Sequence, residues 1–177
     1  KILKTFNLIS TKPKIFICNL SEKENLNNNK YLDIIKNDLN DKESIVISIS
    51  AEIESQIAQL EKEIEKKEFL NSLGWNISGL DKIIKSSYDK LDLITYFTAG
   101  EKETKAWTVK KNSTAPDASC VIHTDFQKGF ICAETMSYED YIKYGGSKGA
   151  KENGKIRQEG KEYLVKDGDI IHFLFNV

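Results

Sequence analysis

The sequence predicts an α/β unit followed by a smaller α+β unit. Residues 14–18 (KIFIC) and 44–49 (SIVISI) are short apolar runs bounded by polar, turn-forming residues, as is typical of strands buried in a parallel sheet. From Leu93 onward the pattern changes to short strands separated by short helices. A chain of 177 residues, of which 40% are hydrophobic, is long enough to build two small cores of this kind.

In the first part, residues 31–39 have helical spacing and lie between the two apolar runs, which predicts a right-handed strand–helix–strand unit. Residues 1–9 are interpreted as the end of a preceding helix. Residues 52–73 are predicted to form one long helix that ends at Gly74, and its alternating charges indicate a solvated face. A further helix begins near Ser78 and leads into the second part of the chain.

The second part has four candidate strands, at residues 93–98, 104–110, 130–136 and 170–175. A helix is expected near residues 116–123, with helical pieces near 137–143 and 147–153. Asp167-Gly168 is a tight-turn signal in front of the last strand. A strand pair, a helix and further strands in a small domain predict a β-grasp (ubiquitin-like) fold.

The charge composition favours no particular polyanion or membrane. The formal net charge is −1, with 26 basic and 27 acidic residues in the chain. The acidic and basic residues are balanced in each half, so no bulk attraction to nucleic acid or to an anionic membrane is implied. Arg157 is the one arginine, and every other basic residue is a lysine. The three cysteines lie far apart, which favours buried, reduced thiols over a zinc site or a disulfide framework.

Five segments of the second half carry a resemblance to a known family. They are residues 93–101 (LITYFTAGE), 106–108 (AWT), 114–118 (TAPDA), 121–126 (VIHTDF) and 167–173 (DGDIIHF). Together they resemble the TGS domain that ends the YchF-type (Obg-like) P-loop ATPases. The resemblance implies that residues 93–177 form a TGS domain. It also implies that residues 1–92 form the C-terminal part of a Rossmann-like P-loop nucleotide-binding domain, with residues 1–9 ending a helical arm.

The same resemblance implies a function for the full-length protein. It would be a cytoplasmic, ribosome-associated hydrolase that prefers ATP over GTP and uses Mg²⁺ with the nucleotide. The TGS domain would contact RNA or the ribosome, and neither a membrane nor DNA is expected as a partner. The alternative is a stand-alone TGS-type module that binds RNA or protein and has no nucleotide function.

The candidate base-binding residues follow the two apolar runs. Asn19, Leu20 and Glu22 stand where P-loop GTPases have Asn-Lys-x-Asp, whose Asp accepts two hydrogen bonds from guanine. Glu22 is one methylene longer than Asp, so its carboxylate cannot take the same place, and the guanine preference should relax. YchF-type proteins have Asn-x-x-Glu in place of the Asn-Lys-x-Asp motif of P-loop GTPases. Ser50 and Ala51 follow the second run, where a Ser-Ala contacts the base through backbone groups; Ser50 could equally cap the following helix.

A phosphate-binding loop is not found in the sequence. Residues 149–155 (GAKENGK) match its first seven positions, but Ile156 stands where the magnesium-binding hydroxyl is needed and no apolar strand precedes the segment. We therefore expect no catalytic or metal-binding residue in this chain, no tightly bound cofactor and no ATP turnover by it alone. The missing half of the site is expected upstream of Lys1.

Two further features remain open to more than one interpretation. His123 and Asp125 could suggest acid–base chemistry, but a structural or contact role is favoured because no nucleophile stands nearby. Lys102, Lys105, Lys110 and Lys111 surround Trp107 in sequence order and could form a basic, aromatic patch, whereas Trp107 could equally belong to the core.

Overall fold

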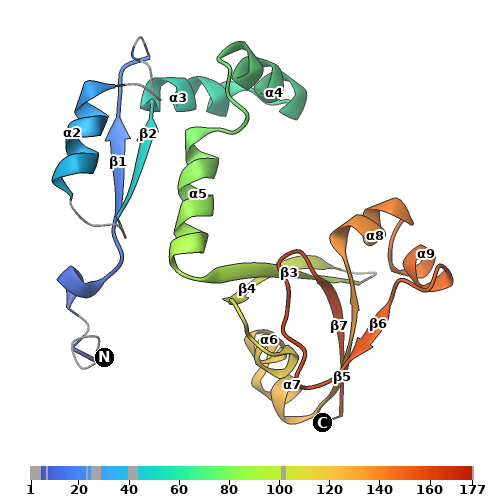
Figure 1. The fold of residues 1–177 in the computed structure, drawn as a ribbon. Coiled ribbons are helices and arrows are strands. Elements are labelled where there is room, and N and C mark those ends of the chain that lie inside the picture. Colours follow the sequence, from blue (N-terminus) through green and yellow to red (C-terminus); the bar gives the residue numbers. More distant parts are fainter. Residues whose placement is uncertain are drawn as a thin grey trace. The chain divides into compact units, whose positions relative to one another are not determined.

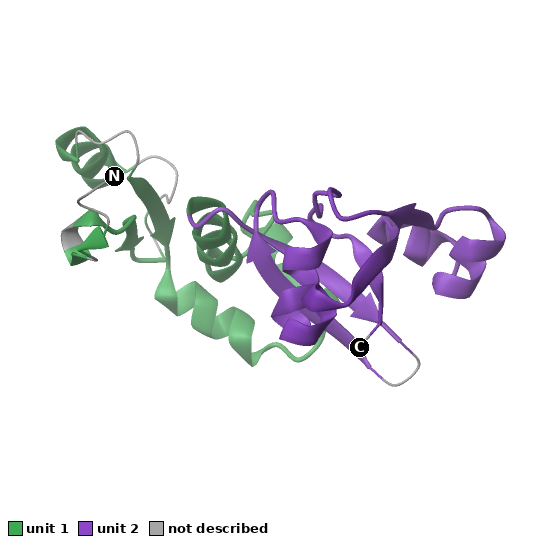
Figure 2. Cartoon of the chain, turned by 90° about the horizontal axis from the view of Figure 1, so that it is seen from below, with its two compact units in different colours: residues 1–90 green, residues 91–177 purple. Residues whose placement is uncertain are grey.

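The computed structural model describes residues 5–6, 8–22, 24, 29–39, 44–100 and 103–176 (Figure 1). The chain separates into two compact units, Lys1–Lys90 and Leu91–Val177, which Figure 2 shows in different colours. Each unit is described by itself below. In the described part of the chain, no helix combines the length and the apolar character needed to cross a bilayer.

Unit 1 contains a parallel strand pair joined through a helix. Strand β1 (Ile15–Asn19) pairs with β2 (Ile45–Ile49) in a register that sets Asn19 opposite Ile49. Helix α2 (Lys30–Asp38) lies between them in sequence, and the side chain of Asn29 caps it by accepting a hydrogen bond from the Tyr31 N–H. The predicted strands and helix are confirmed to within one residue at each end.

The single helix predicted over residues 52–73 is wrong. The structure has two helices, α3 (Ala51–Gln59) and α4 (Glu63–Ser72), because Leu60 between them adopts an extended conformation. In a straight helix Ile57 and Leu70 would lie about 20 Å apart, at ~1.5 Å of rise per residue. The break instead lets both pack in one buried cluster with Ile53. Burial of these side chains outweighs the helix hydrogen bonds lost at the break.

Helix α5 (Gly79–Lys90) begins against α3. The Glu54 carboxylate on α3 accepts hydrogen bonds from the backbone N–H groups of Gly79 (2.7 Å) and Leu80 (3.2 Å). The Ser78 hydroxyl accepts a third, from the Asp81 N–H at 3.0 Å. The first N–H groups of a helix have no partner within it, so Glu54 couples the start of α5 to α3.

The predicted end of a helical arm at residues 1–9 falls largely outside the described residues, which exclude residues 1–4 and Asn7. Within the described residues, a 3₁₀ turn, η1 (Ile9–Thr11), precedes β1.

Unit 2 is built on a five-stranded mixed sheet. Its strands are β3 (Leu93–Ala99), β4 (Thr104–Lys110), β5 (Phe130–Met136), β6 (Arg157–Glu159) and β7 (Ile170–Phe175), in the order β4-β3-β7-β5-β6. The central pair β3 and β7 is parallel, and the other pairs are antiparallel. The four predicted strands are confirmed. Strand β6 was not predicted, because three residues are too few to show a period.

The helices of unit 2 form two groups, one packed on the sheet and one at the end where β5 ends and β7 begins (Figure 1). Helices α6 (Ala115–Ile122) and α7 (Thr124–Lys128) follow β4, and α8 (Tyr138–Lys143) and α9 (Ser147–Glu152) follow β5. The main core joins β3, β7 and α6, and at its centre Tyr96 is fully buried, edge-on to Phe173. A second cluster of Met136, Ala150 and Ile170 anchors the α8–α9 hairpin. Helix α7 was not predicted.

Candidate functional site

The carboxyl ends of β1 and β2 meet at one edge of their sheet. Because the strands are parallel and Asn19 lies opposite Ile49, the two following loops leave from the same edge. The Asn19 side-chain oxygen Oδ1 accepts a hydrogen bond from the Ala51 N–H at 2.9 Å, and the Leu20 N–H donates to the Ile49 carbonyl at 2.9 Å. The structure therefore joins the two predicted loops by direct hydrogen bonds.

Ser50 lies at the junction of β2 and α3 and is fully buried. It occupies the N-cap position of α3, and its carbonyl accepts from the Glu54 N–H at 3.0 Å. Its hydroxyl forms no cap bond and has no hydrogen-bond partner among the described residues. The interpretation that the Ser50 side chain caps the helix is therefore wrong.

The fifth predicted residue, Glu22, lies apart from these contacts. It is exposed and sits in a turn. The carboxylate that closes the loop belongs to Glu24, which accepts from the Ser21 N–H and from the Asn29 side-chain amide, each at 3.2 Å. Sequence reasoning missed Glu24, although Ser21 and Glu24 have the S-x-x-E spacing that lets a carboxylate reach back to a backbone N–H.

The chemistry of this edge suits a polar aromatic ring better than a phosphate. The Ala51 N–H at the start of α3 is already bonded to Asn19. The first turn of α3 also carries Glu52 and Glu54, whose charges oppose an anion there. Among the described residues, no group of three or more His, Cys, Asp or Glu side chains is arranged to hold a metal ion. What the edge offers is amide and backbone hydrogen-bonding groups.

His123 has a structural role between two short helices. It ends α6 and caps α7, where its Nδ1 accepts a hydrogen bond from the Asp125 N–H at 3.2 Å. The Asp125 carboxylate lies 3.4 Å from the same nitrogen, and 60% of the His123 side chain is exposed. An Nδ1 that accepts from the backbone is positioned as a cap rather than as a catalytic base.

The predicted basic patch around Trp107 is only partly formed. The Lys105 ammonium lies 4.2 Å from the centroid of the Trp107 ring, and the Trp107 Nε1–H donates to the Thr98 hydroxyl. Lys110 instead donates to the Leu91 carbonyl, and Lys102 lies outside the described residues. Trp107 also packs against the main core, so both interpretations of this residue hold in part.

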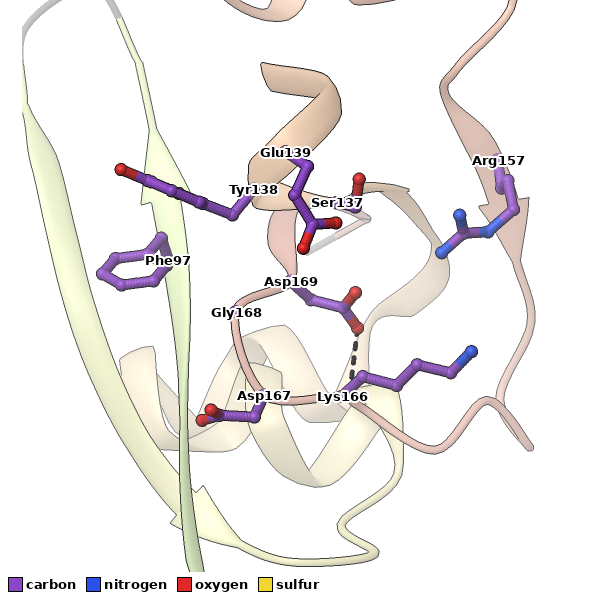
Figure 3. Close-up of a pocket in the computed structure, with 9 residues that line it drawn as sticks. All are labelled: Phe97, Ser137, Tyr138, Glu139, Arg157, Lys166, Asp167, Gly168 and Asp169. Carbon is purple, nitrogen blue, oxygen red and sulfur yellow. Dashed lines mark hydrogen bonds between the residues drawn. The ribbon is translucent and has the colours of Figure 1, made fainter. Parts of the chain in front are cut away.

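Unit 2 contains a cleft of about 760 Å³ that sequence reasoning did not anticipate (Figure 3). It is lined by Phe97 on β3, residues 137–139 at the start of α8, Arg157 on β6 and residues 166–169 before β7. The predicted turn at Asp167-Gly168 forms its floor, with Gly168 at φ +80. The sequence predicted a turn at these residues but not a cleft. The cleft brings together residues up to 72 positions apart, and no local pattern in the sequence indicates that.

The turn is held by its own carboxylates. The Asp167 carboxylate accepts from the Thr95 N–H at 2.8 Å. Asp169 is buried, and one of its oxygens accepts from the Tyr163 hydroxyl at 2.7 Å and from the Lys166 N–H at 2.9 Å. These bonds give the cleft a fixed floor.

Burial, with the bond to Asp169, raises the pKa of Tyr163 to about 12. An unfolded tyrosine ionises near pH ~10, so the neutral side chain stabilises the fold below that pH. That stability should be lost as pH rises from about 10 to 12, and urea unfolding across this range should show it. Tyr163→Phe should make the decline shallower. Equal slopes for the two proteins would show that Tyr163 does not titrate with folding.

The chain resembles known proteins in both fold and sequence. The fold is a mixed α/β fold that matches the structure of the Schizosaccharomyces pombe YchF GTPase, with a TM-score of 0.82 and 39% identity over 98% of this chain and 46% of that one. Residues 93–176 match the family model YchF-GTPase_C, described as a protein of unknown function (DUF933). The resemblance seen in the sequence is thus confirmed.

Whole-chain relatives agree with this assignment. The chain is 50% identical to the ribosome-binding ATPase YchF of Haemophilus influenzae, over 99% of this chain and 48% of that protein. It is also 50% identical to the Bacillus subtilis ribosome-binding ATPase YchF and 42% identical to Obg-like ATPase 1 of Rattus norvegicus. The chain is therefore homologous, over its whole length, to the C-terminal half of the YchF-type (Obg-like) ATPases. It spans about half the length of these curated relatives.

Proposed function

We propose that this chain supplies the base-binding side of the nucleotide site, and a TGS domain, to a ribosome-associated NTPase of the YchF (Obg-like) type that prefers ATP over GTP. The observation that carries the proposal is the hydrogen bond between Asn19 and Ala51, which joins the two loops at the carboxyl edge of β1 and β2. Open α/β sheets bind nucleotides at such an edge. The relatives' names as ribosome-binding ATPases support the activity, the ribosomal partner and a cytoplasmic location.

The strand pair of unit 1 supports its assignment to a larger Rossmann-like P-loop domain. Parallel sheets are normally covered on both faces and rarely consist of two strands. In β1, Ile17 is 49% exposed, and among the described residues β1 pairs with β2 alone. A sheet that continued beyond β1 would satisfy that edge. We therefore assign residues 1–92 to the C-terminal part of such a domain.

The sheet order of unit 2 supports the TGS assignment for residues 93–177. A parallel central pair, β3 and β7, is flanked on each side by antiparallel strands, and α6 packs on the core face. That is the arrangement of a β-grasp fold. The contact with RNA or the ribosome is proposed for this domain on the strength of the relatives' names.

Within the site, each residue has a separate role. With its oxygen engaged by Ala51, Asn19 keeps its amide nitrogen available to hydrogen-bond the base. Leu20 provides an apolar contact, and the backbone of Ser50 and Ala51 lies along the edge of the base, where the Ala51 N–H holds Asn19 in place. Glu22, exposed in its turn, contacts the base loosely or points away. The phosphates and Mg²⁺ would be held by parts of the protein that this chain does not contain, as in P-loop enzymes generally.

Base choice tests this proposal. In the full-length protein, Leu20→Lys combined with Glu22→Asp should move the preference toward GTP by about 1–3 kcal/mol, because it restores a bidentate carboxylate for guanine. The measurement compares ATP and GTP dissociation constants before and after the change. Glu61→Asp, on the exposed segment between α3 and α4, is the matched control and should leave the ratio unchanged.

An unchanged ratio in the double variant would mean that this loop does not read the base.

The 177-residue chain alone should show no Mg²⁺-dependent ATP turnover, because positioning and neutralisation of the phosphates supply most of the catalysis in such enzymes. Turnover by the chain alone would contradict the division of the site proposed here. A full-length protein that binds ribosomes but no nucleotide would favour a TGS-type interaction module.

A further inference from the structure

Arg157 is the one arginine of the chain, and it lines the cleft of unit 2. Its Nε donates to the Glu159 carboxylate at 3.1 Å. Lysine occupies every other basic position, yet lysine has no planar fork for binding a carboxylate through two hydrogen bonds. Glu159 holds the Arg157 guanidinium at a position where its planar geometry matters.

The two ends of the cleft carry different kinds of side chain (Figure 3). The aromatic rings of Phe97 and Tyr138 lie at one end, and Arg157 and Lys166 lie at the other. The carboxyl groups of Glu139 and Asp169 lie between them, and that of Asp167 lies below the aromatic end. Three acidic and two basic side chains give the lining a formal charge of −1.

Some of these groups remain available to a ligand. Asp169 has one oxygen committed to two hydrogen bonds, and Asp167 has one committed to Thr95. Glu139 is exposed beside Tyr138, which is itself 55% exposed. An aromatic face next to a free carboxylate is a setting that recognises a cationic side chain. The guanidinium of Arg157 recognises a carboxylate.

We propose that this cleft binds a segment of a partner polypeptide in which a lysine or arginine side chain stands beside a carboxylate side chain. The cation lies against Phe97, Tyr138 and Glu139, and the carboxylate pairs with Arg157. The volume, about 760 Å³, is within the range of ligand-binding pockets, roughly 300–1,000 Å³. A nucleotide fits the charges less well, because its phosphate would enter a lining in which carboxylates outnumber cations. This inference does not depend on the nucleotide site proposed for unit 1.

The single arginine makes the test direct. In a ¹⁵N-labelled sample of the 177-residue chain, the side-chain Nε–H of Arg157 gives the one arginine signal, which needs no further assignment. An acetylated and amidated Gly-Lys-Asp-Gly peptide should shift this signal saturably. The same peptide with norleucine for lysine should bind about threefold to tenfold more weakly, as expected for the loss of one ion pair and one cation–π contact.

Variants separate the two ends of the cleft. Glu139→Gln should weaken the lysine peptide about threefold and leave the norleucine peptide unaffected, whereas Glu152→Gln on α9 is the matched control and should change neither. Arg157→Lys should weaken both peptides, read from the backbone amide of Gly168. Retained backbone amide spectra confirm that each variant is folded.

Three results would overturn the proposal. One is the absence of a saturable shift of the Arg157 signal up to the solubility limit of the lysine peptide. Another is equal binding of the lysine and norleucine peptides. The third is tighter binding of AMP or of a uridine tetranucleotide than of the peptide, which would identify the cleft as a nucleotide or RNA site instead.

Discussion

Tyr96→Ala is expected to destabilise unit 2 by about 3–5 kcal/mol, the usual cost of removing a large buried aromatic side chain. Tyr96 is fully buried at the centre of the main core, and its ring meets Phe173 edge-on with centroids 5.9 Å apart. Its hydroxyl donates to the Ala118 carbonyl on α6 at 2.8 Å. The residue therefore links β3, β7 and α6, and its loss removes contacts with all three.

Urea unfolding followed by circular dichroism measures this effect, with Tyr96→Phe as the matched variant. Phe keeps the ring and loses the hydroxyl, so it should cost about 0.5–1.5 kcal/mol, the usual net contribution of one hydrogen bond. If the two substitutions cost the same, the hydrogen bond to α6 would be the main contribution and not the packing of the ring.

Gly149→Ala should destabilise the α8–α9 hairpin by about 3 kcal/mol, at the upper end of the usual cost of overpacking. A Cβ at this position would clash with the Tyr144 carbonyl oxygen, so the backbone of one helix would have to move. The movement would disturb the neighbouring cluster of Met136, Ala150 and Ile170. Thermal unfolding should show a lower midpoint for unit 2.

Gly160→Ala is the control for this prediction. A Cβ at Gly160 would meet no atom within 4 Å, and Gly160 is not among the described glycines with positive φ. The substitution should be neutral or stabilise the protein by about 0.4–1 kcal/mol, because alanine restricts the unfolded chain. A comparable loss of stability in both variants would show that the close approach at Gly149 is not the cause.

The elements with a strong local pattern could be predicted from the sequence. The apolar runs ending at Cys18 and Ile49, and the four strands of unit 2, are found within one residue of their predicted ends. Helix α6 is also confirmed, and Thr114 and Asp117 at its start form a reciprocal capping box. In each case the prediction rests on the spacing of apolar and capping residues within a few neighbouring positions.

The elements set by packing could not be predicted. The break at Leu60 exists because Ile57 and Leu70 bury more apolar surface when they pack together than a continuous helix would allow. Strand β6 is three residues long, and pairing with β5 defines it.

The candidate sites, too, were determined partly by local sequence and partly by tertiary packing. The sequence by itself determined which residues follow the two parallel strands, because strand ends and turn residues are local features and the family resemblance marks Asn19 and Ala51. Only the tertiary structure decided that these loops are tied by a hydrogen bond, that the Ser50 hydroxyl is buried without a cap bond, and that the Glu24 carboxylate accepts from the Ser21 N–H. It alone also brought Phe97 and Arg157 to one cleft. Residues 60 positions apart meet only through the pairing of strands, which no local pattern records.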